Sequence, residues 1–227
     1  MMKHDAHIQE PSAILDRMAD GFARFQEKWC TDGTLDTSLL NRQSPKAVVI
    51  ACSDSRVDPA IVLDAEPGEL FVVRNVGNLV PPFEPDGQRH GVSAALEYAV
   101  RILRIPDILI MGHARCGGYA GMLDTSMPME TSFLDAWMAT AAKAIRIADA
   151  QLDAHTDMDE RLEAYAMWGI RLSLENLMGF PWIAERVAEG SLRLHGLYFD
   201  MTAGTLLHFT PGKDHFVPVQ PVQGCAG

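Results

Sequence analysis

Two short polar motifs each follow an apolar run, and their side chains could do chemistry. Cys52, Asp54 and Arg56 stand in the segment CSDSR, directly after AVVIA, and the segment GHARCGG, with His113 and Cys116, follows ILIM. Cysteine thiolate and histidine imidazole are the usual ligands of zinc, and a catalytic zinc site keeps one tetrahedral position open for water. His113 and Cys116 offer two ligands on one tight loop, and Cys52 could supply the third from a neighbouring strand end. The spacing therefore predicts a zinc site.

Each motif on its own also has an ordinary structural explanation. A buried cysteine is often a small core residue, and a histidine three residues before a cysteine is a frequent coincidence. Asp54 and Arg56 flank a single serine and, taken alone, would be an ion pair in a loop. Arginine can also hold a carboxylate through two hydrogen bonds, which fixes its orientation and lowers its pKa. An ionised Asp54 near the metal could then orient the reacting water.

These motifs need a scaffold that brings distant strand ends together. Residues 47–51, 70–73 and 108–111 are continuously apolar, which is typical of parallel strands buried on both faces. A helical pattern at residues 91–103 separates the second strand from the third, and such alternation implies right-handed βαβ units. Sheets of this kind bind their ligands at the carboxyl ends of the strands.

The whole chain is predicted to have an α/β fold, with a mainly parallel central sheet flanked by helices. Residues 192–199 and 205–209 are further strands, and the hairpin-like segment between them makes the last one an antiparallel edge strand near the C-terminus. Further helices are expected at residues 133–152, 158–178 and 181–189.

We expect one domain over residues 1–227. Residues 1–44 would form an N-terminal helical arm, because apolar residues recur at three- and four-residue steps between positions 11 and 29. Residues 45–215 would form the α/β core, and residues 216–227 an irregular tail. The arm could pack on its own domain or on a neighbouring subunit.

The composition and net charge of the chain exclude several classes of protein. The chain has 227 residues, of which 48% are hydrophobic, so it can bury a substantial core. Its formal charge of −11 argues against nucleic-acid or acidic-membrane partners, which attract clustered lysine and arginine. Four widely spaced cysteines do not make a disulfide scaffold, and neither a secretory signal nor a membrane span is recognisable, so we expect a cytoplasmic protein.

The order of the motifs resembles the β class of carbonic anhydrases. The series C-x-D-x-R, PGE-x-FVVRN and H-x-x-C-G-G carries the resemblance over residues 43–118, and residues 192–200 continue it more weakly. The resemblance implies that Cys52, His113 and Cys116 are the ligands of one Zn²⁺ per subunit. It also implies that Asp54 and Arg56 form the catalytic dyad.

Further residues are implied to bind substrate. Gln43 stands where the plant-type branch keeps a glutamine that binds substrate from across a dimer interface. Phe71, Val76 and Tyr98 match the apolar or aromatic lining of the cleft. The backbone N–H of Gly117 or Gly118, at a helix start, is expected to donate a hydrogen bond to an anion. Arg74 and Asn75 are expected to be structural, holding either the active-site loop or the dimer interface. One branch has a tryptophan in an inhibitory bicarbonate pocket where this chain has Val49, so we expect that pocket to be absent.

The implied activity is the reversible hydration of carbon dioxide to bicarbonate and a proton, in a homo-oligomer with a dimer as minimal unit and possibly a tetramer or larger. His90 and Tyr98 are candidates for the group that accepts the proton, although a role as a loop or helix-start residue is favoured for His90. Two alternatives remain. One is hydrolysis of carbonyl sulfide or carbon disulfide on the same scaffold, and the other is a non-catalytic zinc-binding protein.

Overall fold

The computed structural model describes residues 13–31, 41–123, 132–210 and 215–220 of the chain. Its contacts divide the chain into two compact units, residues 1–43 and residues 44–227. That the two form a single domain stays a prediction. No helix within the described ranges is both long and apolar enough to cross a membrane.

The first unit contains the predicted amphipathic helix. α1 spans Ala13–Phe25 and continues as a π-helical turn, η1, at Gln26–Thr31. The predicted start at residue 11 lies outside the described residues. No residue of α1 is buried, although its apolar face is wide. The exposed side chains of that face are Ile14, Leu15, Met18, Phe22 and Phe25.

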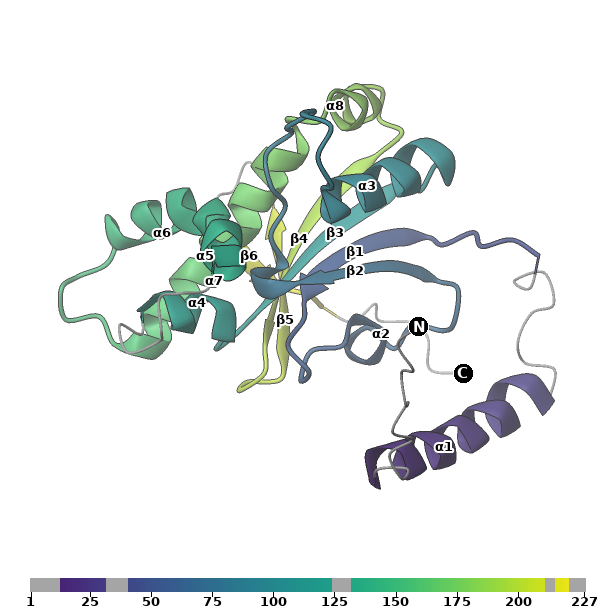
Figure 1. Cartoon of the computed structure of the whole chain (residues 1–227). Helices are drawn as coiled ribbons and strands as arrows, with labels where there is room; N and C mark the ends of the chain where they lie inside the picture. The colour runs from purple at the N-terminus through teal and green to yellow at the C-terminus, as the bar shows by residue number, and fades with distance from the viewer. Residues whose placement is uncertain (1–12, 32–40, 124–131, 211–214, 221–227) are drawn as a thin grey trace, which may run out of the picture. The chain divides into compact units, whose positions relative to one another are not determined.

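The second unit is built on a six-stranded sheet with the order β2-β1-β3-β4-β5-β6 (Figure 1). The four strands from β2 to β4 pair in parallel, and β5 and β6 extend the sheet in antiparallel pairing. The predicted fold class is therefore confirmed. The strands are β1 (Ala47–Cys52), β2 (Leu70–Asn75), β3 (Asp107–His113), β4 (Arg193–Asp200), β5 (Thr205–Thr210) and β6 (His215–Pro218).

The C-terminal end of the sheet differs from the prediction. β5 was expected at the edge, but β6 pairs with it and takes the edge position. The irregular tail predicted from residue 216 is therefore wrong at its start. The physical reason is the aromatic side chain of Phe216, whose ring centroid lies 5.3 Å from that of Phe209 and 6.4 Å from that of Tyr198. The predicted hairpin between β4 and β5 is confirmed.

The helices follow the predicted pattern with three differences. The segment 91–103 is a regular helix only in its first half and then becomes a π-helical turn, and the segment 133–152 is divided into shorter helices. A short helix directly after the Cys52–Arg56 loop was not predicted. The elements are α2 (Pro59–Val62), η3 (Val76–Asn78), α3 (Gly91–Glu97), η4 (Tyr98–Ile102), α4 (Gly117–Leu123), α5 (Ser132–Met138), η5 (Ala139–Ala141), α6 (Ala142–Asp149), α7 (Met158–Leu177) and α8 (Pro181–Ala188).

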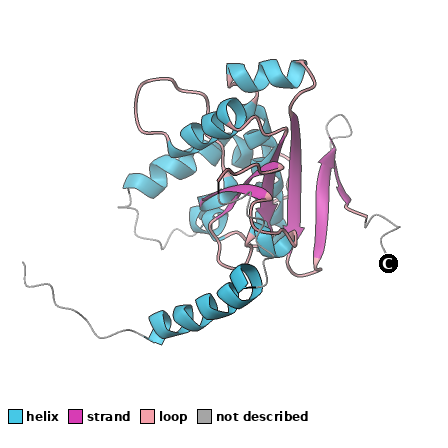
Figure 2. Ribbon diagram, turned by 90° about the vertical axis from the view of Figure 1, so that its right-hand side faces the viewer, coloured by secondary structure: helices cyan, strands magenta, loops and turns pink. Residues whose placement is uncertain are grey.

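Most helices of the second unit cover one face of the sheet, as Figure 2 shows. On that face Ile50 of β1 belongs to the same buried cluster as Ile170 of α7. The alternate side chains Val49 and Met111 form a smaller cluster on the other face, against Val62 of α2. Both faces of β1 are buried, which explains why its sequence is apolar without alternation.

The parallel register determines where the motifs meet. β1 lies between β2 and β3, with Cys52 opposite Asn75 and Ala51 opposite Met111. Met111 is two residues before His113, so the carboxyl ends of β1 and β3 reach the same edge of the sheet. α4 begins at Gly117, immediately after the loop that carries Cys116. The sheet thus gathers both polar motifs at one edge.

A close packing contact fixes α4 against α7. A methyl group added at Gly169 of α7 would lie 1.8 Å from the hydroxyl oxygen of Tyr119 and 2.9 Å from its Cζ atom. Tyr119 belongs to α4, is fully buried, and has its hydroxyl 3.5 Å from the carbonyl oxygen of Gly77. Burial raises the pKa of this phenol. Only glycine at position 169 leaves room for the ring.

We predict that Gly169→Ala lowers the free energy of unfolding by roughly 3 kcal/mol, the upper end of the usual cost of overpacking a core. Gly91→Ala is the matched control, since a Cβ atom at Gly91 in the first turn of α3 would meet no atom within 4 Å. Urea unfolding of both variants beside the wild type measures the difference. Equal stability of the two variants would contradict this packing.

Candidate metal centre

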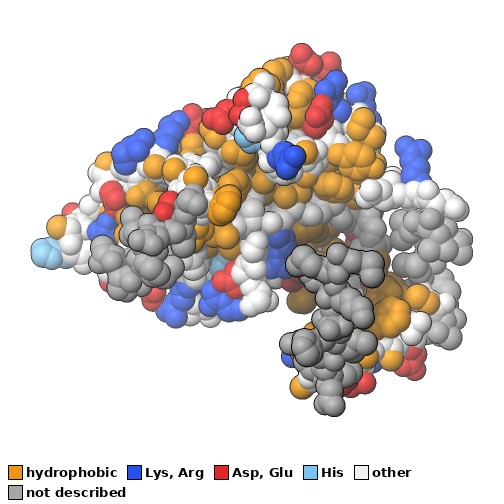
Figure 3. Space-filling view, in the orientation of Figure 1, with side chains coloured by type: hydrophobic (Ala, Val, Ile, Leu, Met, Phe, Trp, Pro, Cys, Tyr) orange, Lys and Arg blue, Asp and Glu red, His pale blue; other side chains and the backbone are white. Residues whose placement is uncertain are grey.

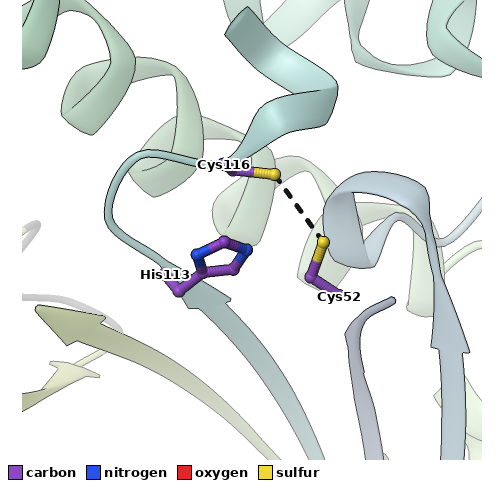
Figure 4. A group of neighbouring side chains, drawn as sticks. All are labelled: Cys52, His113 and Cys116. Carbon is purple, nitrogen blue, oxygen red and sulfur yellow. Dashed lines mark hydrogen bonds between the residues drawn. The ribbon is translucent and has the colours of Figure 1, made fainter. Parts of the chain in front are cut away.

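Three buried side chains converge at the carboxyl edge of the sheet. Cys52, at the end of β1, His113, at the end of β3, and Cys116, in the following loop, offer ligand atoms that all lie within 4.8 Å of one another. The two sulfur atoms are 3.7 Å apart, and Figure 4 shows the imidazole of His113 beside them. The predicted ligand set is therefore brought together.

The orientation of His113 suits a metal ligand. Its Nδ1 atom lies 2.8 Å from the carbonyl oxygen of Ala114, and a carbonyl can only accept, so Nδ1 carries the proton and donates. Nε2 consequently carries the lone pair. Nε2 is buried and has no hydrogen-bond partner among the described residues. A buried, unpartnered lone pair beside two thiols is the donor arrangement that Zn²⁺ requires.

The local electrostatics favour thiolate at Cys52. The thiol of Cys116 lowers the pKa of Cys52 to about 4 against the opposing effect of burial, with further contributions from His113 and from the backbone N–H groups of Asp54 and Gly77. The neighbouring Cys52 and burial raise the pKa of Cys116. Without a cation the pair therefore keeps one proton between the two sulfur atoms, and a divalent cation displaces it.

Asp54 and Arg56 form the predicted ion pair beside this cluster. Arg56 donates from Nε to Oδ1 of Asp54 at 2.9 Å and from Nη2 to Oδ2 at 2.6 Å, and its backbone N–H donates to Oδ1 at 3.0 Å. These hydrogen bonds hold the pKa of the Asp54 carboxyl well below its usual range. Nη2 also donates to the carbonyl oxygen of Arg115, which ties the two motif loops together.

Arg74 holds the loop of the metal centre, which is one of the two structural roles expected for it. Its guanidinium donates to the carbonyl oxygens of Cys52 at 2.9 Å and Asp54 at 2.6 Å, and to the carboxylate of Asp58 at 2.8 Å. Asn75 follows it, and its carbonyl oxygen accepts from the N–H of Ser53. The end of β2 therefore fixes the backbone of the Cys52–Asp54 loop. The motif FVVRN was the signal, but partners that are backbone carbonyls leave no trace in a sequence.

The residues predicted to line the substrate cleft do not all make the same kind of contact. The rings of Phe71 and Tyr98 lie 6.1 Å apart between centroids. Val76 packs closely on Gly118. A Cβ atom added at Gly118 would lie 2.8 Å from Cγ1 of Val76. Gly117 starts α4, with free space beside its α-carbon.

Gln43 is exposed and belongs to the first unit, so its role stays a prediction. Val49 is fully buried, and the absence of a bicarbonate pocket around it also stays a prediction.

Comparison with known proteins gives a consistent result. The family model described as carbonic anhydrase matches residues 47–206. A carbonic anhydrase of Pseudomonas aeruginosa is 40% identical over 190 residues, which cover 82% of this chain and 84% of that protein. Beta carbonic anhydrase 5, chloroplastic, of Arabidopsis thaliana is 37% identical over 204 residues, covering 89% and 67%. The solved structure of the β-carbonic anhydrase CcaA has a TM-score of 0.83 at 31% identity, covering 93% and 94%.

Catalytic zinc sites have three protein ligands, whereas structural zinc sites have four. The cluster here offers three. A zinc enzyme is thus the class that this strand-end cluster defines. The matches make the class specific: the chain belongs to the β-class carbonic anhydrase family, whose members hydrate carbon dioxide reversibly.

We predict that Cys116→Ser lowers zinc affinity by on the order of 100-fold or more, because loss of even an outer-shell partner costs 10–100-fold and serine does not ionise at neutral pH. Cys30→Ser is the matched control, since Cys30 is an exposed free thiol. Elemental analysis of the purified proteins after dialysis measures bound zinc. Wild-type zinc content in Cys116→Ser would exclude this ligand set.

Proposed function

We propose that the ion pair of Asp54 with Arg56 directs the reacting water in the reversible hydration of carbon dioxide. The observation that supports this role is an arginine-held carboxylate in the loop directly after a zinc ligand. Zinc, held by Cys52, His113 and Cys116, lowers the pKa of a bound water to near neutrality. The remaining tasks fall to the side chains of the chain.

Asp54 has one acceptor site left for this task. A carboxylate offers about four lone-pair sites, and Arg56 occupies three of them, two on Oδ1 and one on Oδ2. Because its pKa is lowered, Asp54 stays ionised and can only accept hydrogen bonds. The free site on Oδ2 accepts the proton of the reacting water and thereby turns the lone pair of that water toward carbon dioxide.

The substrate pocket combines apolar walls with a few donors. Carbon dioxide is neutral and weakly hydrated, so the side chains of Phe71, Val76 and Tyr98 are sufficient to hold it. The backbone N–H of Gly117 is a donor for the anionic product, at the start of a helix. Gln43 donates to the oxygen that gains charge in the transition state, and it does so from another copy of the chain. Donors of this type contribute a few kcal/mol to catalysis.

No observation favours either of the two alternative functions, a non-catalytic zinc-binding protein or a hydrolase of carbonyl sulfide or carbon disulfide. A structural zinc site needs a fourth protein ligand, and within the described ranges the cluster contains three potential ligands. Hydrolysis of carbonyl sulfide would use the same residues, and a sulfide-release assay beside the hydration assay separates the two activities.

We predict that Asp54→Asn lowers kcat for hydration by about 100-fold, the lower end of what a group handling a proton contributes, while bound zinc is unchanged. Asp64→Asn is the matched control, because Asp64 is exposed and its left-handed backbone (φ 49°) suits asparagine equally well. Stopped-flow hydration assays and zinc analysis on the same samples measure both quantities. Undiminished turnover, or unfolding with loss of zinc, would argue for a structural pair instead.

We further propose that the enzyme is a homo-oligomer with a dimer as minimal unit, in which the apolar face of α1 covers another copy. Five large apolar side chains of α1 are exposed, and such a face is stabilised by a covering surface. β2 is an edge strand of the sheet, and Val72 on it and Tyr98 and Ile102 in η4 are also exposed. Figure 3 shows exposed hydrophobic side chains gathered on this side of the second unit. Solved β-carbonic anhydrases of Sordaria macrospora, at 31% identity and a TM-score of 0.76, are tetrameric.

We predict that Phe22→Glu dissociates the oligomer toward smaller species, because it places a charge in the apolar face of α1. Ala23→Glu adds the same charge to the next residue of the helix, outside that face, and should keep the native mass. Light scattering after gel filtration measures the mass of each variant. The same mass for Phe22→Glu as for the wild type would remove α1 from the interface.

The cytoplasm remains our proposal for the location of the enzyme. It is supported by cysteine usage: among the described residues Cys30, Cys52 and Cys116 are free thiols, and two of them need a reducing environment to serve as ligands.

A further inference from the structure

A cavity of about 760 Å³ lies beside the metal centre and carries one imidazole. Most of its wall is apolar, from Val76, Pro81, Val92 and the aromatic side chains of α5, while Arg89 and His90 supply titratable groups. Asn75 also lines it. A mainly apolar cavity with a few polar groups is the usual form of a functional site. The catalytic pair Asp54–Arg56 does not account for this cavity.

Asn75 and Val76, which line the cavity, also lie next to the metal centre. Asn75 is the register neighbour of Cys52 in the parallel pair of β1 and β2, and neighbouring strands are about 4.8 Å apart. The N–H of Gly77, the residue after Val76, donates to the sulfur of Cys52. Val76 also packs on Gly118, in the first turn of α4 directly after Cys116. The cavity therefore adjoins the ligand loops on two sides.

His90 is placed to exchange protons in this cavity. Its carbonyl oxygen accepts from the N–H of Ala94 at the start of α3, so the predicted helix-start role is confirmed for its backbone. Its side chain makes no capping hydrogen bond. Instead Nε2 lies 2.7 Å from Oδ1 of Asp86. The N–H of Gln88 and the ring of His90 lower the pKa of Asp86, so this carboxylate accepts from Nε2–H and leaves the lone pair on Nδ1.

We propose that His90 is the proton relay of the enzyme, a role that rests on the proposed hydration reaction. Each carbon dioxide hydrated gives one bicarbonate and one proton. Water in the cavity conducts that proton to Nδ1 of His90, and the imidazolium releases it to buffer while Asp86 keeps its charge. Imidazole is suited to this step because it ordinarily gains and loses a proton between pH 5 and 8. His90 acts through water and does not touch the substrate.

The surroundings of His90 are charged but nearly balanced. Asp86 and Arg89 belong to its own loop, and Glu84, Glu97 and Arg101 line an adjoining cavity that shares His90. Arg101 is paired with Glu97 at 2.6 Å. Two other histidines are poorer candidates because they lie on β4 and β5. His195 is opposite Leu109, four residues before the zinc ligand on β3 and so about 13 Å away along the strand.

The experiment compares His90→Ala with His155→Ala, which removes an exposed imidazole from the connection between α6 and α7. Stopped-flow hydration is measured over a range of buffer concentrations, with zinc content and melting temperature of each sample. At low buffer we expect kcat of His90→Ala to fall about tenfold, a modest share of what proton-transferring groups contribute. We expect its kcat/KM to be unchanged, because that ratio reports the interconversion of carbon dioxide and bicarbonate. High buffer or added imidazole should restore kcat, and His155→Ala should behave as the wild type.

Asp86→Asn provides a second, independent measurement, since it keeps the imidazole but removes its charged partner; we expect a partial loss of kcat, again without an effect on kcat/KM. A parallel fall of kcat and kcat/KM in His90→Ala, or a loss that buffer does not restore, would overturn the relay. So would an unchanged kcat at low buffer. Failure of the hydration reaction itself is distinct, because it would show in the wild type and in Asp54→Asn.

Discussion

Two buried sulfur atoms 3.7 Å apart impose the strongest constraint on this structure. Both must be thiolates to bind zinc, and two negative charges at that distance and out of water repel each other. The chain offsets part of this repulsion with backbone N–H groups, from Asp54 and Gly77 toward Cys52 and from Gly118 and Tyr119 toward Cys116. The rest is left to a divalent cation. Metal binding and the order of these loops are consequently linked.

The donors around the sulfurs come from segments that are far apart in sequence, and the sheet is what aligns them. β1 contributes the first thiol, β3 the imidazole, and the turn after β2 the N–H of Gly77. The close contact between Tyr119 and Gly169 then fixes the helix that follows the second thiol. Core packing and site electrostatics are therefore not separate properties. A shift of α7 would move the N–H donors of Cys116.

The sequence was most informative where a residue type has few alternative uses. The buried strands, the zinc ligands and the Asp54–Arg56 pair were all predictable, because apolar runs and Cys/His spacing carry direct physical meaning. Strand β6 was missed because its four residues gain their stability from aromatic contacts of Phe216 across the sheet. The environment of Gln43 could not be derived either. Gln43 is exposed and belongs to a separate unit, so no buried contact within the described residues determines its surroundings.

Arg74 shows how a basic residue can be irreplaceable without a salt bridge to the catalytic groups. Its three partners are two main-chain carbonyl oxygens and one side chain, reached from Nε, Nη1 and Nη2 of one planar group. Lysine has the same charge but a single nitrogen, whose donors diverge from one point. A lysine at position 74 therefore could not donate to all three partners at once. Position 74 therefore requires the planar guanidinium group, and replacing arginine by lysine there is not a conservative substitution.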